Sequence, residues 1–266
     1  MLRSFSEVEG ARIHADDGQT GSVRTLYFDD ESWEVRHFVV ATGPPLAGRD
    51  VLLPPGTVWE DGTTRASVLR TDLTKEEVKN APGAESDPPV AAQQSSARLG
   101  VPPYPVMGGA AEIPVAMPAD PRTLRAMDRS AADPAEDDGL PETGDPHLRS
   151  AEEVLGYRVR SSDGEIGHVE DLVVDAGDWV VRYVAVDTRN WLPGKKALVA
   201  ASWVTGVSWP DAELFVCVDS IELKEAPAWN PNVPIDRVYE EKLHAYYGRT
   251  PYWVWQRRNA TRRKEA

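Results

Sequence analysis

The sequence repeats itself once, at a fixed offset of 146 residues. Residue n aligns with residue n + 146 without a gap from Leu2 to Val58, and 22 of those 57 positions are identical. The shared positions include the turn residues Asp17-Gly18 and Asp163-Gly164. A long period seen twice indicates a duplicated domain, whereas a solenoid needs at least three short repeats. We therefore expect two copies of one small fold.

Both copies contain the same signals for secondary structure. Each begins with a capping box, at Ser4–Glu7 and Ser150–Glu153, and each helical turn is ended by a glycine. Short apolar runs separated by Asp-Gly and Asp-rich turns follow, which predicts strands. The predicted strands are 11–15, 21–28, 33–41, 51–53 and 65–69, with second-copy counterparts at 157–161, 167–174, 179–187, 197–199 and 214–218. The fold class is therefore mainly β, with one small antiparallel barrel in each copy.

The composition divides the chain into four parts. We predict barrel copies at 1–82 and 147–227, a linker at 83–146 and a C-terminal extension at 228–266. The linker is rich in Pro, Ala, Gly, Ser and Asp and contains neither Trp nor Phe. Such a segment buries too little apolar surface to offset its ordering entropy, so we expect it to be flexible. Within it, 101–107 and 121–127 are either short recognition segments or plain linker.

The C-terminal extension is rich in aromatic residues and is the only net-positive part of the chain. Apolar residues at three- and four-residue spacing predict a helix over 234–248, and a basic tail lies at 257–264. Two interpretations are open: the aromatic side chains bind a partner, or they cover one of the barrels. The candidate partner-binding residues are Tyr246, Tyr247, Tyr252, Trp253 and Trp255.

The spacing of the repeated residues resembles a known family. The first copy carries Val8-x-Gly10, Asp17-Gly18-x-x-Gly21-x-Val23, Asp29 and Trp33-x-Val-Arg36. This arrangement, repeated between Val154 and Val199, is similar to the PRC-barrel family. The fold of that family is found in the cytoplasmic part of the photosynthetic reaction-centre H subunit and in a ribosome-maturation factor. The resemblance implies a small barrel that docks on other proteins, with no catalytic machinery to carry over.

The motifs of common enzymes and metal sites are absent from the sequence. There is no phosphate-binding Gly-rich loop, no Gly-x-Ser-x-Gly and no His-Glu-x-x-His. The five histidines are isolated, although His14 and His37 could approach each other across neighbouring strands. Arg36 and Arg182 recur at one repeat position, and we expect them to face outward and pair with turn carboxylates. We predict no enzyme, no cofactor and no metal site.

The bulk properties narrow the partners and the compartment. A formal net charge of −14 opposes direct contact with nucleic acid, which needs clusters of Lys and Arg. The single cysteine, Cys217, suits a reducing compartment, and we expect it to be a buried strand residue. No run is long and apolar enough to predict a secretion signal or a membrane span. We therefore expect a soluble, cytoplasmic protein.

These observations favour a binding or scaffold protein. A domain this small buries only about 60% of its unfolded surface, so each copy needs support from the other copy or from a second chain. We expect two acidic barrels, spaced by the linker, that hold a protein partner or self-associate. One alternative is an accessory factor in ribosome assembly or RNA metabolism. Another is a soluble accessory of a membrane electron-transfer complex.

Overall fold

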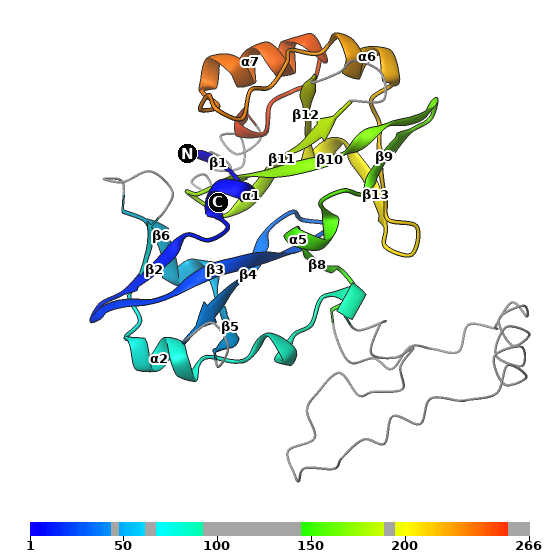
Figure 1. Cartoon of the computed structure of the whole chain (residues 1–266). Coiled ribbons are helices and arrows are strands. Elements are labelled where there is room, and N and C mark those ends of the chain that lie inside the picture. Colours follow the sequence, from blue (N-terminus) through cyan, green and yellow to red (C-terminus); the bar gives the residue numbers. More distant parts are fainter. Residues whose placement is uncertain (44–47, 62–67, 93–144, 189–194, 255–266) are drawn as a thin grey trace, which may run out of the picture.

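A computed structural model describes residues 1–43, 48–61, 68–92, 145–188 and 195–254. It contains two curled sheets, one per copy, with short helices at their edges (Figure 1). The first sheet has the order β5-β4-β3-β2-β7-β6 and the second the equivalent order β12-β11-β10-β9-β14-β13. The prediction of two mainly β copies is thus confirmed.

The first copy contains the five predicted strands and two that were not predicted, β1 and β6. Its strands are β1 (Leu2–Ser4), β2 (Arg12–Ala15), β3 (Gly18–Asp29), β4 (Val35–Thr42), β5 (Arg49–Leu53), β6 (Val58–Glu60) and β7 (Val68–Thr71). Its helices are α1 (Phe5–Val8) and α2 (Lys75–Asn80), with 3₁₀ turns η1 (Pro55–Thr57) and η2 (Ala84–Ser86).

The second copy repeats this list. Its strands are β8 (Leu148–Ser150), β9 (Arg158–Ser161), β10 (Gly164–Asp175), β11 (Val180–Asp187), β12 (Lys196–Ala200), β13 (Val204–Ser208) and β14 (Glu213–Val216). Its helices are α5 (Ala151–Val154), α6 (Ser220–Glu225) and α7 (Arg237–Tyr246), with the 3₁₀ turn η3 (Ala201–Trp203).

Neither sheet is wholly antiparallel, which differs from the prediction. β2 pairs in parallel with β7, and β9 pairs in parallel with β14. The last strand of each copy therefore lies between its neighbour in sequence and the first strand after the helical turn. This pairing curls each sheet, and apolar alternation alone carries no information about strand direction.

The repeated tryptophans occupy turns and not the first strand positions predicted for them. Trp33 and Trp179 have φ values of 63° and 51°, and the backbone N–H of each donates to the carbonyl four residues earlier. A left-handed conformation costs a non-glycine residue about 1–2 kcal/mol. Both indoles are buried, which offsets that cost, and the Nε1 of Trp179 donates to the Val58 carbonyl at 2.7 Å.

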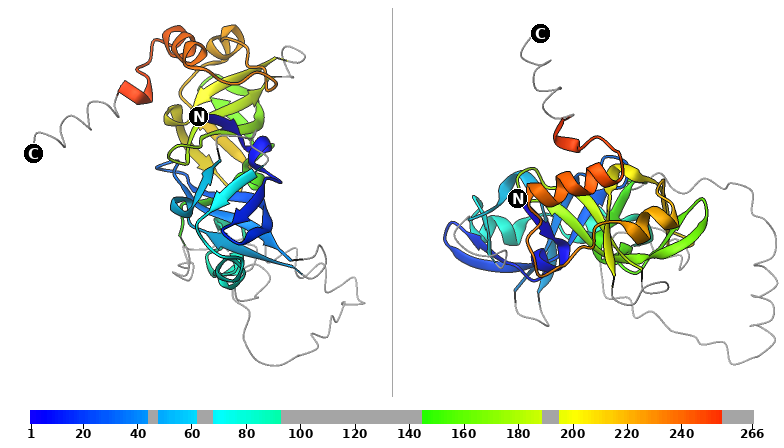
Figure 2. Two further views of the ribbon diagram at one scale, coloured as in Figure 1. Left: turned by 90° about the vertical axis from the view of Figure 1, so that its left-hand side faces the viewer. Right: turned by 90° about the horizontal axis from the view of Figure 1, so that it is seen from above.

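The first segment of each copy crosses to the other copy. β1 pairs with β10 and β8 pairs with β3, both antiparallel and in equivalent register. The helical turns go with them, since α1 packs against β10 and α5 against β3. We name residues 1–8 and 147–154 the two arms. Figure 2 shows the blue N-terminal segment reaching the green and yellow half of the molecule.

The predicted capping box is present at the start of the first arm. The Glu7 carboxylate accepts from the backbone N–H of Ser4 at 3.3 Å, and the Ser4 side chain completes the box. In the second arm, Ser150 makes no side-chain cap, so the capping box predicted there is not formed, and Glu153 accepts from the Tyr157 hydroxyl at 2.5 Å. Each arm is thus a strand followed at once by one helical turn, and the turn of the first arm is capped.

A short backbone ladder joins the copies beside the arms. Val35 N–H donates to the Trp179 carbonyl, and Val181 N–H donates to the Trp33 carbonyl, both at 2.8 Å. We name this contact the seam. The largest apolar cluster runs across it without interruption and includes Phe5, Phe38, Val174 and Tyr183.

This shared core corrects one expectation. The two barrels are not spaced by the intervening segment, because they bury their apolar side chains against each other. The predicted linker also begins later than expected, since η2 and the buried Val90 still belong to the first body. Residues 93–144, including both candidate recognition segments, lie outside the described residues.

Cys217 is exposed, so the prediction of a buried strand residue is wrong. β14 ends at Val216, and Val216 and Val218 both face the core. The alternation along the chain therefore turns Cys217 outward.

Candidate interaction surface

The C-terminal extension packs on the second copy through α7. The predicted helix begins at Arg237 and not at 234, because Asp236 caps it: the Asp236 side chain accepts from Tyr239 N–H at 2.8 Å. The inner face of α7 buries Glu240, Leu243 and His244. In Figure 1, α7 lies with α6 at the top of the second copy, above β11 and β12.

A buried polar network fastens α7 to β11. The Tyr183 hydroxyl donates to Glu240 Oε1 at 2.8 Å and lies 3.1 Å from His244 Nε2. Arg237 Nη1 forms an ion pair with Glu240 Oε2 at 3.1 Å. Burial lowers the pKa of His244 to about 4, so this imidazole is neutral at pH 7. Burial also raises the pKa of Glu240, which the Tyr183 hydrogen bond and Arg237 oppose.

Aromatic rings complete the contact between the extension and the second copy. Tyr247 packs on Trp203 with ring centroids 4.7 Å apart, and only 6% of its surface is accessible. The Arg182 guanidinium lies 4.2 Å from the centroid of the Tyr252 ring, and that of Arg237 lies 3.9 Å from the centroid of Trp253. These cation–π contacts hold the segment after α7 against the barrel.

The structure therefore separates the predicted partner-binding residues. Tyr247 is buried, and Tyr252 and Trp253 are half-buried in contacts within the chain. Tyr246 is 39% exposed, and its hydroxyl donates to the Glu222 carbonyl at 2.8 Å. Trp255 lies outside the described residues. Of the five, Tyr246 alone among those described presents a substantial outer surface.

The outer face of the extension carries apolar side chains that the sequence reading did not select as a site. Val238 on α7 is 72% exposed, and Val233 in the preceding loop is 56% exposed. Both line an open groove of about 320 Å³, together with Trp229, Ile235 and Tyr239. We name this region the α7 groove. Its polar rim is formed by Asn230, Asp236 and Lys242.

Sequence periodicity could not have separated the two faces of α7. The predicted apolar stripe included Val238, yet the structure buries Glu240 and His244 in the inner face and leaves Val238 outside. Glu240 and His244 are polar, and their partner, Tyr183, is more than 50 residues away in sequence. The signal that places them inward lies in β11 and not in the helix.

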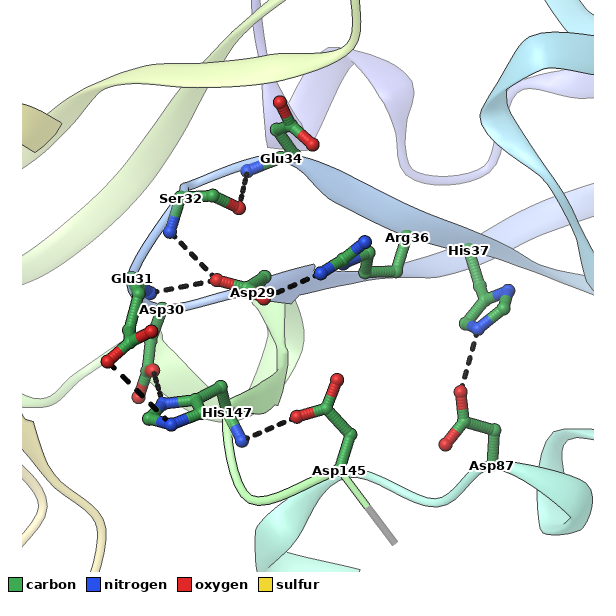
Figure 3. Close-up of polar contacts among 10 residues, drawn as sticks. All are labelled: Asp29, Asp30, Glu31, Ser32, Glu34, Arg36, His37, Asp87, Asp145 and His147. Atoms are coloured by element: carbon green, nitrogen blue, oxygen red, sulfur yellow. Dashed lines mark hydrogen bonds and ion pairs between the residues drawn. The ribbon is translucent and has the colours of Figure 1, made fainter.

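The second arm is anchored to the first copy by a charged cluster. The Asp30 carboxylate contacts His147 Nδ1 at 2.9 Å (Figure 3). It also accepts from Arg149 Nε at 2.6 Å. Asp30 N–H also donates to the His147 carbonyl at 3.0 Å. The hydrogen bond to Asp30 raises the pKa of His147. Asp30 thus binds the strand through its backbone and two side chains.

The repeated arginines pair with turn carboxylates, as predicted, but only Arg36 faces outward: its side chain is 47% exposed, whereas that of Arg182 is 11% exposed. Arg36 Nη2 donates to Asp29 Oδ2 at 2.9 Å (Figure 3). Burial acts to raise the pKa of Asp29, but hydrogen bonds from Ser32, Arg36 and Glu31 lower it to about 2. In the second copy, Arg182 pairs with Asp178. These arginines hold turns in place at the seam.

The histidines do not form a paired site. β3 separates β2 from β4, so His14 and His37 lie on strands that are not neighbours, and His37 Nε2 contacts Asp87 at 2.8 Å instead. One group among the described residues has ligand-like spacing: His168, Glu170 and Asp187 place their ligand atoms within 4.8 Å of one another. Lys196 forms an ion pair with Glu170, so a cation would compete with an ammonium group already at this position.

The comparison with family models agrees with the strand topology. Residues 146–210 match the family model of the PRC-barrel domain, so the second copy is similar to that domain. The equivalent strand order of the first sheet is compatible with a second, PRC-like copy. No curated protein matches the chain. No helix within the described ranges is long and apolar enough to cross a membrane.

Proposed function

We propose that this protein is a non-catalytic binding protein that holds a protein partner in its α7 groove. The observation that carries the proposal is the exposure of Val238, 72% accessible on a helix whose opposite face is buried. Exposed apolar side chains that gather beside a groove, with polar residues at its rim, are typical of protein–protein contacts. The partner that fits is a protein segment with an apolar side chain that fills the groove.

The α7 groove is held in shape before any partner arrives. Its helix is tied to β11 by Tyr183, Glu240 and His244, and Tyr239 on the same helix donates to the Pro227 carbonyl at 3.2 Å. A surface fixed by buried contacts loses little entropy when it binds. The presence of a PRC-barrel domain is consistent with a binding or scaffold role. Because the groove belongs to the extension, it has no counterpart in the first copy.

A matched pair of substitutions tests this proposal. Val238→Asp places a charge in the α7 groove, whereas Phe215→Asp does the same at a 37% exposed site on β14. Each tagged full-length variant is used to recover partners from the native host, and its mass in solution is measured by sedimentation. We expect Val238→Asp alone to abolish recovery of the protein that the wild type enriches. Equal recovery by both variants would refute the α7 groove as the binding surface, and a loss of self-association in Val238→Asp alone would identify the partner as a second copy.

A further inference from the structure

The two arms have nearly the same sequence but lie on different acceptor surfaces. Five of their eight positions are identical: Leu2 with Leu148, Arg3 with Arg149, Ser4 with Ser150, Glu7 with Glu153 and Val8 with Val154. The shared residues give both arms the same strand, the same register and a helical turn of the same length. Discrimination between the two acceptors must therefore come from the positions that differ.

One differing position is matched by a polar contact. In the first arm, Ser6 faces Asp171 on β10: its backbone N–H and its hydroxyl donate to the carboxylate at 3.2 and 2.6 Å. In the second arm, the equivalent residue is Glu152, and the equivalent acceptor residue is Thr25, whose Oγ1 accepts from Glu152 N–H at 3.2 Å. Asp171 is only 5% exposed, and burial raises its pKa.

Pairing of like copies would bring the wrong groups together. If the second arm lay on the second copy, Glu152 would stand where Ser6 stands, beside the buried Asp171. The buried Asp171 carboxylate would then lose the Ser6 hydroxyl donor and face the Glu152 carboxylate, whose side chain is exposed in the observed pairing. The loss of a donor and the approach of a like charge both disfavour a buried carboxylate.

A second differing position is matched by volume. Phe5 in the first arm is fully buried, and the acceptor strand β10 contributes valines at Val173 and Val174. In the second arm, Ala151 takes this place, and the equivalent of Val174 on the acceptor strand β3 is the larger Phe28, which lies in the same apolar cluster as Ala151. A large arm residue thus accompanies a small acceptor residue, and a small arm residue accompanies a large one.

The third difference lies at the first residue of each arm. His147 contacts Asp30 on the first copy, and the repeat equivalent of Asp30 on the second copy is Ala176, which has no carboxylate. On the second copy, the position of His147 is taken by Met1, whose carbonyl accepts from Ala176 N–H at 2.9 Å. Charge, volume and hydrogen bonding therefore all favour pairing of each arm with the opposite copy over pairing with its own copy.

From these matches we propose that the arms carry a pairing code: each arm fits only the opposite copy, and the chain folds as one matched pair of unlike copies. The interaction surface is the free edge of β3 or β10, and its partner is the unlike arm of the same chain. The residues that set the code are Ser6 with Asp171, Glu152 with Thr25, Phe5 and Ala151. This proposal goes beyond the α7 groove, because it concerns what joins the copies and not what the protein binds.

The code is tested in the full-length chain by a double-mutant cycle. Ser6→Glu gives the first arm the charge of the second, and we expect the unfolding equilibrium constant to rise about a hundredfold or more, since the buried Asp171 carboxylate loses its hydroxyl donor and gains a like charge beside it. Asp171→Thr gives the second copy the acceptor residue of the first. In that background, Ser6→Glu recreates the Glu152–Thr25 pair, and its effect should shrink to less than about tenfold. Ser202→Glu at an exposed site is the control for added negative charge.

If Ser6→Glu does not fold, an equivalent double-mutant cycle between the second arm and the first copy provides the test. Thr25→Asp places a carboxylate against Glu152, and Glu152→Ser should relieve it. Melting temperatures that do not change with protein concentration would assign the pairing to arms of one chain, and concentration-dependent melting would refute that assignment. Additive effects in both cycles, or double variants no more stable than the charged single variants, would overturn the code.

Discussion

His244 is a buried histidine whose neighbours leave it uncharged at pH 7. Only 2% of its surface is accessible, and it lies between Tyr183 on β11 and the rings of Trp203 and Trp253. His244 and Trp33 of the first copy both line a pocket of about 260 Å³ at the seam. Protonation of His244 would place an unpaired charge where α7, the second copy and the seam meet.

This environment predicts acid sensitivity. A histidine whose pKa falls to about 4 on folding contributes stability that is present above pH 6.5 and lost as the pH falls toward 4. We expect the free energy of unfolding to fall by up to about 3 kcal/mol from this group. Glu240 acts in the opposite direction, because its raised pKa means that protonation favours the folded state.

Urea denaturation at several pH values isolates the contribution of His244. His244→Gln should flatten the acid limb relative to the wild type, whereas His14→Gln on β2 should leave it unchanged. If the wild type and His244→Gln lose stability in parallel between pH 6.5 and 4, protonation of His244 is not the cause.

Two glycines at equivalent repeat positions allow a close approach between strands. A Cβ on Gly21 would lie 2.5 Å from the Ala41 carbonyl oxygen, and one on Gly167 would lie 2.4 Å from that of Asp187. Because a neighbouring backbone cannot move away easily, Gly21→Ala and Gly167→Ala should each cost about 1–3 kcal/mol. Gly206→Ala is the control, since a Cβ there meets nothing within 4 Å. Equal melting temperatures for all three variants would show that the neighbouring strands move apart to accommodate a Cβ at little cost in free energy.

At the scale of elements, each arm strand is only three residues long, so its side-chain anchors matter more than its backbone ladder. β8 depends on Asp30, whose side chain and that of Arg149 are each 9% exposed. β1 is anchored differently: Arg3 Nε donates to Glu60 Oε1 on β6 at 2.6 Å, so the first arm also bridges back to its own copy. Both arms are therefore held by ion pairs that involve the first copy.

Loss of the Asp30 anchor should release the second arm. Asp30→Ala leaves the buried Arg149 without its carboxylate, and we expect a loss of about 3–5 kcal/mol in the free energy of unfolding. Asp50→Ala breaks an ion pair with Arg24, which is 60% exposed, and should cost less than about 1 kcal/mol. Hydrogen exchange in 148–150 should accelerate in Asp30→Ala alone. Unchanged protection there would show that the backbone ladder holds β8 without help.

The repeat predicted most elements but could not predict which copy each arm joins. Ser4 and Glu7 mark the start of α1, and Asp-Gly turns mark the β2–β3 and β9–β10 hairpins, because these signals act within a few residues. The crossing of β1 depends on contacts at least 165 residues apart in sequence, as between Ser6 and Asp171. Sequence periodicity did not predict the α7 groove, because Val238 faces outward only when the polar residues Glu240 and His244 are buried on the opposite face of the helix.

At the scale of the whole molecule, the shared core makes the two copies one folding unit. Each sheet lacks one strand without the other copy, and the largest apolar cluster contains residues of both. We therefore expect a single calorimetric unfolding transition whose van't Hoff and calorimetric enthalpies agree. Two separate transitions, or an enthalpy ratio near one half, would show that the copies unfold independently.

The crossing of the arms also has a consequence for synthesis on the ribosome. Asp29 on β3 is made 119 residues before Leu148, its strand partner. At about 5–20 residues per second, translation needs roughly 6–24 seconds to supply that partner. Throughout this time the edge of β3 in the nascent first half is unpaired, and β1 lacks its acceptor strand, β10. The late emergence of residues 147–175 thus sets the earliest moment at which either half can be complete, and a pause before that point would prolong the exposure of a surface open to aggregation.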